Sequence, residues 1–367
     1  VKVEKKIGNG VLSFETGQLA KQAAACVLAR YNDTVVINAV ASGSARPGQD
    51  FFPLTCDYRE RTCAAGKFPG GFLKREGRPS MKETLTARLM DRPIRPLFPK
   101  GYIDEVQCCA SVLASDRQTD GDMLAMNGTA AALLVSPLPF EGPVASVRVG
   151  RIDGELVAFP THDELENSDL DLIVSGGETE VAMIEGFAME IPEDEMGDAI
   201  MFAHSVIKDI CELQRELAEK CDVQKVEYVA PEDDGLYGRL VDGYYEDFKS
   251  AKQMEGKQNR AEAVSALKEK ARAEIIPDPE AADATCPARF STVWHDLEEK
   301  VVRDLILAGT RPDGRDNKTV RAIECEVDLL PRVHGSALFQ RGETQALITV
   351  TLGTGRDEQK VDGLVEE

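Results

Sequence analysis

The first 150 residues carry apolar positions in short alternating runs, the pattern that predicts β-strands. In "CVLARYNDTVVINAVA", two apolar-rich runs flank Asn32 and Asp33, which predicts a β-hairpin. "TDGDMLAMNGTAAALLV" predicts a turn and then a helix rich in small residues, with Asp122 as its N-cap. Strand character returns between residues 145 and 190, and helical periodicity follows from about 197 to 220.

The sequence pattern changes in residues 236–308. This stretch is rich in charged residues, its apolar residues recur with helical periodicity, and it has few runs of β-branched residues. In "STVWHDLEEKVVRDLILAGT", four apolar residues recur every fourth position and form one face of a helix that Gly309 ends. These four residues are Val293, Leu297, Val301 and Leu305. The pattern predicts a separate helical domain.

An internal repeat follows this helical stretch. "ACVLARYNDTVVINAV" (residues 25–40) aligns with "GSALFQRGETQALITV" (residues 335–350) at a constant offset of 310. The repeat predicts a second copy of the first hairpin, within a second copy of the first core. At the same offset, the last residue corresponds to Asp57 of the first copy, so we expect the second copy to be truncated.

Composition predicts a globular protein without a membrane span. Apolar residues make up 43% of the chain, enough to form buried cores, and no apolar run approaches the ~18 residues of a membrane helix. We see no basic-then-apolar leader. Nine cysteines without a C-x-x-C pair indicate reduced thiols in the cytoplasm, and four scattered histidines do not suggest a metal site.

Positive charge is concentrated in one segment of this acidic chain. The formal net charge is −21, yet residues 67–100 hold nine Lys or Arg and three Asp or Glu. Ser80 and Glu83 form the S-x-x-E pattern of a helix-capping box, and several glycines precede them. Glycines, free amides at a helix N-terminus and cations together can bind a phosphate group. A neighbouring aromatic ring can stack on a base, which is typical of sites that bind single-stranded nucleic acid. The alternative is a solvated turn whose cations pair with the three acids of the segment, Glu76, Glu83 and Asp91.

Other candidate sites leave more than one interpretation open. Arg88, Arg92 and Arg95 recur at near-helical spacing and serve equally well as RNA ligands or as packing and salt-bridge residues. Asp169 and Asp171 alternate on a predicted strand, where they either bind a metal or are merely solvated. The acids of "SDRQTDGDM" either hold a cation or cap a turn. The common nucleotide-binding loops are absent from the sequence.

Two long segments carry a resemblance to a known family. "FFPLTCDYRERTCAAGKFPGGFLKREGRPSMKETLTARLMDRPIRPLFPKGY" resembles the first core of the polynucleotide phosphorylases. "RPDGR" followed by "LPRVHGSALFQRGETQALITVTLGTGRDEQ" resembles the opening of their second core. The resemblance implies an α/β (α+β) protein. Its parts are a first ribonuclease PH-like core with mixed sheets and helices (1–230), an all-helical domain (236–309) and the start of a second such core (311–367).

The resemblance also implies an activity, that of a polyribonucleotide nucleotidyltransferase. Such an enzyme degrades single-stranded RNA, including mRNA, processively from 3′ to 5′ by phosphorolysis, releases nucleoside diphosphates and can run in reverse as a polymerase. Mg²⁺ is the implied cofactor and inorganic phosphate the co-substrate. The implied partners are RNA, two further copies in a homotrimeric ring, and an RNA-degradation complex with an endoribonuclease or helicase, without a membrane. The alternative is a non-catalytic RNA-binding ring component of ribonuclease PH type.

Site residues carry over from the family by position. The pore-constriction loop falls on residues 72–75, where Leu73 replaces the second of two aromatics and Lys74 the first of two arginines. Lysine is a point charge where arginine would bind phosphate bidentately. The resemblance together with the basic segment gives the predicted RNA-binding residues: Phe72, Lys74, Arg75, Arg78, Arg88, Arg92 and Arg95.

The family's catalytic strand has a D-x-K pattern. In the first core, Asp171 occupies the acid position but Ile173 stands in place of the lysine, so we expect this core to be catalytically degenerate. The active strand and the Mg²⁺ ligands are expected in the part of the second core that lies beyond Glu367. The sequence therefore assigns no catalytic residue and no metal ligand in these 367 residues.

Overall fold

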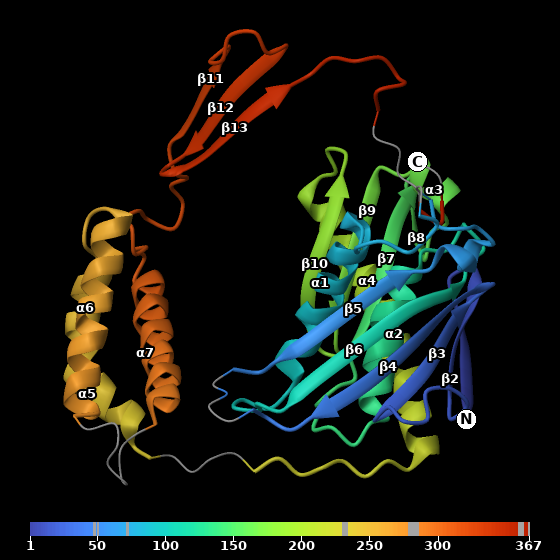
Figure 1. Cartoon of the computed structure of the whole chain (residues 1–367), viewed down its shortest axis with the longest axis horizontal. Helices are drawn as coiled ribbons and strands as arrows, with labels where there is room; N and C mark the ends of the chain where they lie inside the picture. The colour runs from blue at the N-terminus through green and yellow to red at the C-terminus, as the bar shows by residue number, and fades with distance from the viewer. Residues whose placement is uncertain are drawn as a thin grey trace. The chain divides into compact units, whose positions relative to one another are not determined.

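A computed structural model describes residues 1–46, 49, 51–70, 73–229, 234–277, 286–358 and 363–365. The chain divides into two compact units, Val1–Pro231 with Val361–Glu367, and Glu232–Lys360. Each unit has its own helices and strands (Figure 1). Each also has its own apolar core.

The larger sheet of the first unit has six strands, in the order β1-β2-β3-β4-β6-β5. All neighbours are antiparallel except β5 and β6, which are parallel. The strands are β1 (Lys2–Ile7), β2 (Gly10–Thr16), β3 (Ala25–Tyr31), β4 (Thr34–Gly43), β5 (Leu54–Glu60) and β6 (Glu105–Ala114). The predicted hairpin is confirmed, since β3 and β4 pair up to Tyr31 opposite Thr34 and leave Asn32 and Asp33 as the turn.

The smaller sheet is antiparallel throughout, in the order β10-β9-β7-β8. Its strands are β7 (Ala145–Ile152), β8 (Glu155–Ala158), β9 (Leu170–Gly176) and β10 (Val181–Ala188). The short helix α3 (His162–Glu166) follows β8, and the long helix α4 (Glu193–Cys221) packs on β7 and β9.

Helix α2 (Gly121–Leu134) lies between the two sheets, in contact with β3, β4 and β6 on one side and β7 on the other (Figure 1). All its residues up to Leu133 are buried, as expected of a helix that is apolar all round. Close packing requires its small residues, because a Cβ at Gly128 would come within 2.1 Å of the Asn38 amide. Its N-cap is Asp120 rather than the predicted Asp122, which occupies the first turn.

Helix α1 (Met81–Ile94) packs against β5 at the edge of the larger sheet. Two short 3₁₀ turns flank this region, Thr62–Ala65 before it and Arg95–Leu97 directly after it. The basic segment thus comprises the connection from β5 to α1 and the helix itself.

The second unit contains α5 (Leu236–Lys252), α6 (Lys257–Ile275), α7 (Pro287–Leu307) and a three-stranded sheet. The predicted apolar face of α7 is confirmed, since all four of its residues are buried beside Trp294. The helix ends at Leu307, and Gly309 follows in the left-handed conformation (φ 87°).

The sheet of the second unit confirms the internal repeat. Strands β12 (Gly335–Arg341) and β13 (Thr344–Val350) lie 310 positions after Ala25–Tyr31 and Thr34–Val40, and they pair in the same register. Strand β11 (Ile323–Val327) adds to β12 as β2 adds to β3. The mixed α/β class predicted from the sequence is confirmed. Among the described residues, no helix is long and apolar enough to span a membrane.

Candidate nucleic-acid interface

The start of α1 is fixed by its own side chains. The Ser80 hydroxyl accepts from the Glu83 amide at 3.1 Å, and the Glu83 carboxylate accepts from the Ser80 amide at 2.6 Å. The predicted capping box is therefore confirmed. The other carboxylate oxygen of Glu83 accepts from the Glu60 amide at 2.9 Å, which ties the first turn to the end of β5.

The connection before α1 is held against the same strand end. Arg59 donates to the Gly77 carbonyl at 3.0 Å, and the Thr62 amide and hydroxyl both donate to Glu76 at 3.2 Å. Nη1 of Arg59 is buried and makes no hydrogen bond, but it lies 3.6 Å from the Glu83 carboxylate as an ion pair. The backbone around Gly77 is thus positioned by β5 and the turn that follows it.

The cations of this loop stay exposed. Residues 73–80 are all exposed, and Lys74 has a left-handed backbone (φ 48°). Within the described part of the chain, Lys74, Arg75 and Arg78 make no ion pair or side-chain hydrogen bond. Phe72, also predicted to bind RNA, lies outside the described residues.

The acids of the segment do not neutralise these cations. Glu76 accepts from Thr62, Glu83 caps α1, and Asp91 pairs with Arg95. The interpretation of the loop as a turn closed by its own ion pairs therefore does not describe this structure. The positive charge of the loop is left available to an anionic ligand.

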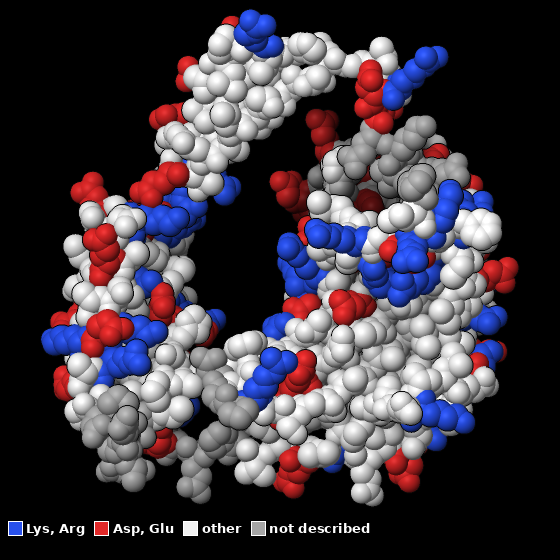
Figure 2. All heavy atoms as spheres, viewed as in Figure 1, with Lys and Arg blue, Asp and Glu red and all other residues white. Residues whose placement is uncertain are grey.

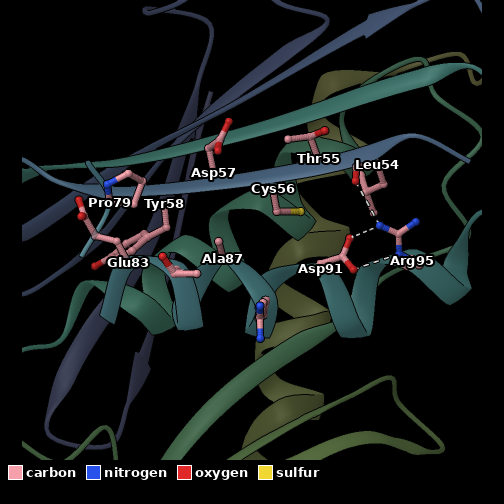
Figure 3. A pocket seen from close by; sticks show the side chains of 12 residues that line it. Leu54, Thr55, Cys56, Asp57, Tyr58, Pro79, Glu83, Ala87, Asp91 and Arg95 are labelled. Carbon is pink, nitrogen blue, oxygen red and sulfur yellow. Dashed lines mark hydrogen bonds and ion pairs between the residues drawn. The ribbon is translucent and has the colours of Figure 1, made fainter. Parts of the chain in front are cut away.

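Arg88 and Arg92 of α1, and Arg95 directly after it, differ in their contacts. Arg95 pairs with Asp91 at 2.6 Å, donates to the carbonyls of Phe52 and Leu54, and lies 5.7 Å from the centre of the Phe52 ring. Figure 3 shows its guanidinium turned toward Asp91 and the Leu54 backbone. Arg92 pairs with Glu185 of β10 at 2.7 Å.

Arg88 is the arginine of α1 without a partner among the described residues. It lines a cavity of about 400 Å³ between β5 and α1, together with Asp57, Thr84 and Asp91 (Figure 3). These contacts give Arg95 a structural role in joining α1 to the sheet. RNA binding by Arg88, Arg92 and Arg95 stays a prediction.

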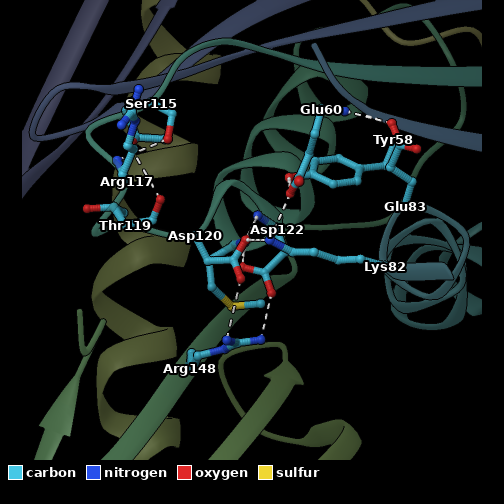
Figure 4. A network of polar contacts seen from close by, with 12 residues as sticks. Tyr58, Glu60, Lys82, Glu83, Ser115, Arg117, Thr119, Asp120, Asp122 and Arg148 are labelled. Atoms are coloured by element: carbon cyan, nitrogen blue, oxygen red, sulfur yellow. Dashed lines mark hydrogen bonds and ion pairs between the residues drawn. The ribbon is translucent and has the colours of Figure 1, made fainter. Parts of the chain in front are cut away.

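A network of charged side chains joins α1, the end of β5, the start of α2 and β7 (Figure 4). Lys82 of α1 contacts Glu60 at 2.9 Å and Asp120 at 3.1 Å. Arg148 of β7 contacts Asp120 at 3.5 Å and Asp122 at 2.8 Å. The network therefore links the helix that follows the loop to both sheets. The sequence predicted Lys82 only as one charge of the basic segment, and it did not predict Arg148, whose partners are 23 or more residues away in the chain.

The two aspartates of this network titrate differently. Burial raises the pKa of Asp122 to about 6, with Arg148 opposing and the neighbouring Asp120 reinforcing the shift. Burial acts in the same direction on Asp120, but the charges of Lys82 and Arg148 outweigh it and hold that pKa below its usual value. Lys82 and Arg148 are shared among several carboxylates, and they stabilise the ionised form of Asp120 better than that of Asp122.

Asp169, directly before β9, and Asp171, within it, do not share a site. Asp169 pairs with Arg151 at 2.6 Å, and this hydrogen bond lowers the pKa of Asp169. Asp171 faces Arg148 instead, at 3.5 Å, and Ile173 is buried in the core. Asp116 caps its turn by accepting from Gln118 and Thr119. Of the described residues, no three or more His, Cys, Asp or Glu lie together as metal ligands would, so we assign no Mg²⁺ ligand here.

Comparison with protein families identifies three regions of the chain. The "3' exoribonuclease family, domain 1" matches residues 11–139 and again residues 319–366, the two copies of the repeat. The "3' exoribonuclease family, domain 2" matches residues 142–206, which contain the smaller sheet. The "Polyribonucleotide nucleotidyltransferase, RNA binding domain" matches residues 236–316.

Curated relatives match over the whole chain. The polyribonucleotide nucleotidyltransferase of Rhodopirellula baltica is 69% identical over 367 residues, which cover 100% of this chain and 49% of that protein. The proteins of the same name from Sorangium cellulosum and Geotalea uraniireducens are 47% and 45% identical, over 98% and 100% of this chain and 48% and 52% of theirs. The chain therefore spans about half the length of the curated relatives it matches.

A solved structure, that of rice Rrp46, matches with a TM-score of 0.46 and 13% sequence identity. The match covers 56% of this chain and 94% of the rice chain.

Proposed function

The chain belongs to the polyribonucleotide nucleotidyltransferase family, and we propose that the full-length protein degrades single-stranded RNA from the 3′ end by phosphorolysis. In this reaction an oxygen of inorganic phosphate attacks the terminal phosphodiester. The bond to the 3′ oxygen of the preceding nucleotide breaks, that oxygen takes up a proton, and a nucleoside diphosphate leaves. The reverse reaction extends the RNA.

The similarity along the whole chain is the observation that supports this proposal most strongly. The exposed, unpaired Lys74, Arg75 and Arg78 add a site that suits a polyanion, because backbone phosphates bind Lys and Arg irrespective of sequence. In the proposed reaction these residues bind and guide the strand; they do not act on the reacting bond.

The remaining parts of the proposal follow from the family resemblance. We expect Mg²⁺ to supply charge stabilisation at the reacting phosphate, with ligands from parts of the protein other than these residues. We also expect a homotrimer whose loops meet at a pore, and a role in mRNA degradation with an endoribonuclease or a helicase. All nine cysteines are free thiols, which favours the cytoplasm.

The test uses full-length protein, an unstructured RNA and separation of the released nucleotides. We expect nucleoside diphosphates only when phosphate and Mg²⁺ are both present, and none from a circular RNA that has no 3′ end. Nucleoside monophosphates released without phosphate would identify a hydrolase and contradict the proposal.

RNA binding without any release would support the second candidate, a non-catalytic ring component. The observation that favours this candidate is the buried Ile173 at the position of the family's catalytic lysine. Measurement of the particle mass in solution tests the trimer separately.

A further inference from the structure

Two cysteines that the proposed function leaves unused lie side by side in the larger sheet. Strands β5 and β6 are parallel, and their register places Cys56 directly opposite Cys108. Residues directly opposite each other on neighbouring strands point to the same face of a sheet, and the strands lie roughly 4.8 Å apart. A disulfide joins Cα atoms about 4.4–6.8 Å apart, so this pair meets the distance requirement without a change of register.

The two thiols are also in contact. The Cys56 thiol is hydrogen-bonded to the thiol of Cys108. Cys108 is 0% exposed, so close packing in the core holds it in place. Its chain neighbour Cys109 points to the opposite face of β6, where Asp57 is its register partner. Cys108, rather than Cys109, is therefore the thiol that Cys56 reaches.

Cys56 connects this pair to solvent. It is half-buried and lines the cavity of about 400 Å³ between β5 and α1. Figure 3 shows its sulfur on the side of β5 that faces α1. A cavity of this size admits a small oxidant, which meets Cys56 first because Cys108 has no exposed surface.

We propose that Cys56 and Cys108 form a site of reversible oxidation by hydroperoxides, in which Cys56 is the attacking thiol and Cys108 the resolving thiol. Their register, their contact and the cavity at Cys56 are the observations that support this site. The product is a disulfide between β5 and β6.

The reaction has two steps. The Cys56 thiolate attacks one oxygen of the hydroperoxide, so that an S–O bond forms, the O–O bond breaks and water or an alcohol leaves. The Cys108 sulfur then attacks the sulfenic acid of Cys56, so that the S–S bond forms, the S–O bond breaks and water leaves. The two thiols lose two electrons and two protons, and the hydroperoxide is reduced. A dithiol restores both thiols by exchange and is itself oxidised.

Oxidation at this site should be slow at neutral pH, because the thiolate is the nucleophile. The hydrogen bond with Cys108 and burial raise the pKa of Cys56 well above its usual value; Asp91 reinforces the shift and Arg95 opposes it. The other charged residues that line the cavity are Asp57, Glu83 and Arg88. Figure 2 shows Lys and Arg side chains on the surface around α1, and positive charge there favours the thiolate. The site therefore stays reduced until hydroperoxide is abundant.

The test exposes the full-length protein to hydrogen peroxide, blocks the remaining thiols with an alkylating reagent and digests the protein for mass spectrometry. Cys108 and Cys109 share one tryptic peptide, residues 101–117, because no Lys or Arg separates them. Two variants distinguish them. Cys108→Ala removes the resolving thiol, and the matched control Cys109→Ala removes its neighbour on the opposite face of β6.

We expect a disulfide link between the Cys56 peptide and residues 101–117 in wild type and in Cys109→Ala, and its loss after treatment with a dithiol. Cys108→Ala should not form this link, and its Cys56 should remain as a sulfenic acid that a dicarbonyl reagent traps. The rate of link formation in wild type should rise about tenfold per pH unit between about pH 7 and 9, as the thiolate fraction rises.

A wild type without the link, a link that persists in Cys108→Ala, or a rate independent of pH would overturn the proposal. Far-UV circular dichroism verifies the fold of each variant. Cys56→Ala, at a half-buried position, removes the attacking thiol and must abolish the link as well, which keeps the test decisive if the buried Cys108 does not tolerate alanine. Because no measurement involves RNA, the result is independent of the proposed function.

Discussion

Asp122 shows how a single buried carboxylate makes stability depend on pH. Its pKa is about 6 in the folded chain against an ordinary value of 3.8, mainly because of burial. As pH rises from about 4 to about 6, the unfolded chain releases this proton while the folded chain keeps it. The free energy of unfolding therefore falls over this window, by up to about 3 kcal/mol, and levels off above it.

Asp122→Asn removes this titration, and we expect it to flatten the decline between pH 4 and 6 in urea unfolding experiments. The variant loses a charged bond to Arg148 but stays neutral at every pH, so its stability changes less across this window than that of wild type. Asp116→Asn is the matched control. Hydrogen bonds from Thr119 and Gln118 outweigh burial and lower the pKa of Asp116, so its contribution is lost only below about pH 4. An unchanged slope in Asp122→Asn would contradict the assignment.

At the scale of elements, the first turn of α1 carries both stability and the position of the loop. Ser80→Ala removes one half of the capping box and should cost about 1 kcal/mol of unfolding free energy. Because the loop cations directly precede this turn, we expect RNA affinity to fall by up to about fivefold. Urea unfolding and RNA binding of the same variant measure the two effects.

Helix α3 provides the control, since Thr161 and Glu164 form the other complete capping box of the first unit's described helices. Thr161→Ala should cost a similar amount of stability and leave RNA affinity unchanged. If both variants lower affinity equally, the first turn of α1 does not position the loop, and the effect is one of general stability.

The features that the sequence predicted correctly are those determined by residues close together in the chain. The capping box at Ser80, the apolar face of α7 and the hairpin repeated at an offset of 310 all depend on residues close together in the chain. The contacts of Arg92 and Arg148 could not be predicted, because their partners lie on elements far away in sequence, β10 and α2. Asp120 and Asp122 both fit the N-cap pattern, and only the backbone geometry distinguishes them.

At the scale of the whole chain, the two apolar cores are made of different residues, which predicts two separate unfolding transitions. Trp294 is the only tryptophan and packs among Tyr244, Phe248 and Phe290 in the second unit. Its fluorescence therefore reports on that unit alone. Phe14→Ala, in the core of the first unit, should cost about 3–5 kcal/mol there.

In the 367-residue chain, we expect Phe14→Ala to shift the unfolding observed by far-UV circular dichroism and to leave the urea midpoint of Trp294 fluorescence unchanged. Leu297→Ala, in the core of the second unit, is the reciprocal variant and should shift the fluorescence midpoint. A common shift of both signals in either variant would show that the two units unfold as one.

The basic loop belongs to the scale of the proposed homotrimer, and its Arg75 and Arg78 are exposed and unpaired in the single chain. Replacing both by Ala should reduce the salt slope of RNA binding by about 1.4 if each contacts one phosphate, and should weaken binding to all sequences alike. Phe72→Ala should instead cost about 1–3 kcal/mol through lost base stacking, with the slope nearly unchanged. If the loops meet at the pore of the proposed homotrimer, short oligonucleotides that do not reach it should be less affected than long ones.

The control for the loop is Lys21→Ala with Arg30→Ala, which removes two exposed cations elsewhere on the first unit. Affinity is measured against salt for wild type and all variants in the assembled protein. An arginine variant with the wild-type slope, or a phenylalanine variant that changes only the slope, would show that the assigned roles are wrong. The exposed loop would then be a structural turn between β5 and α1.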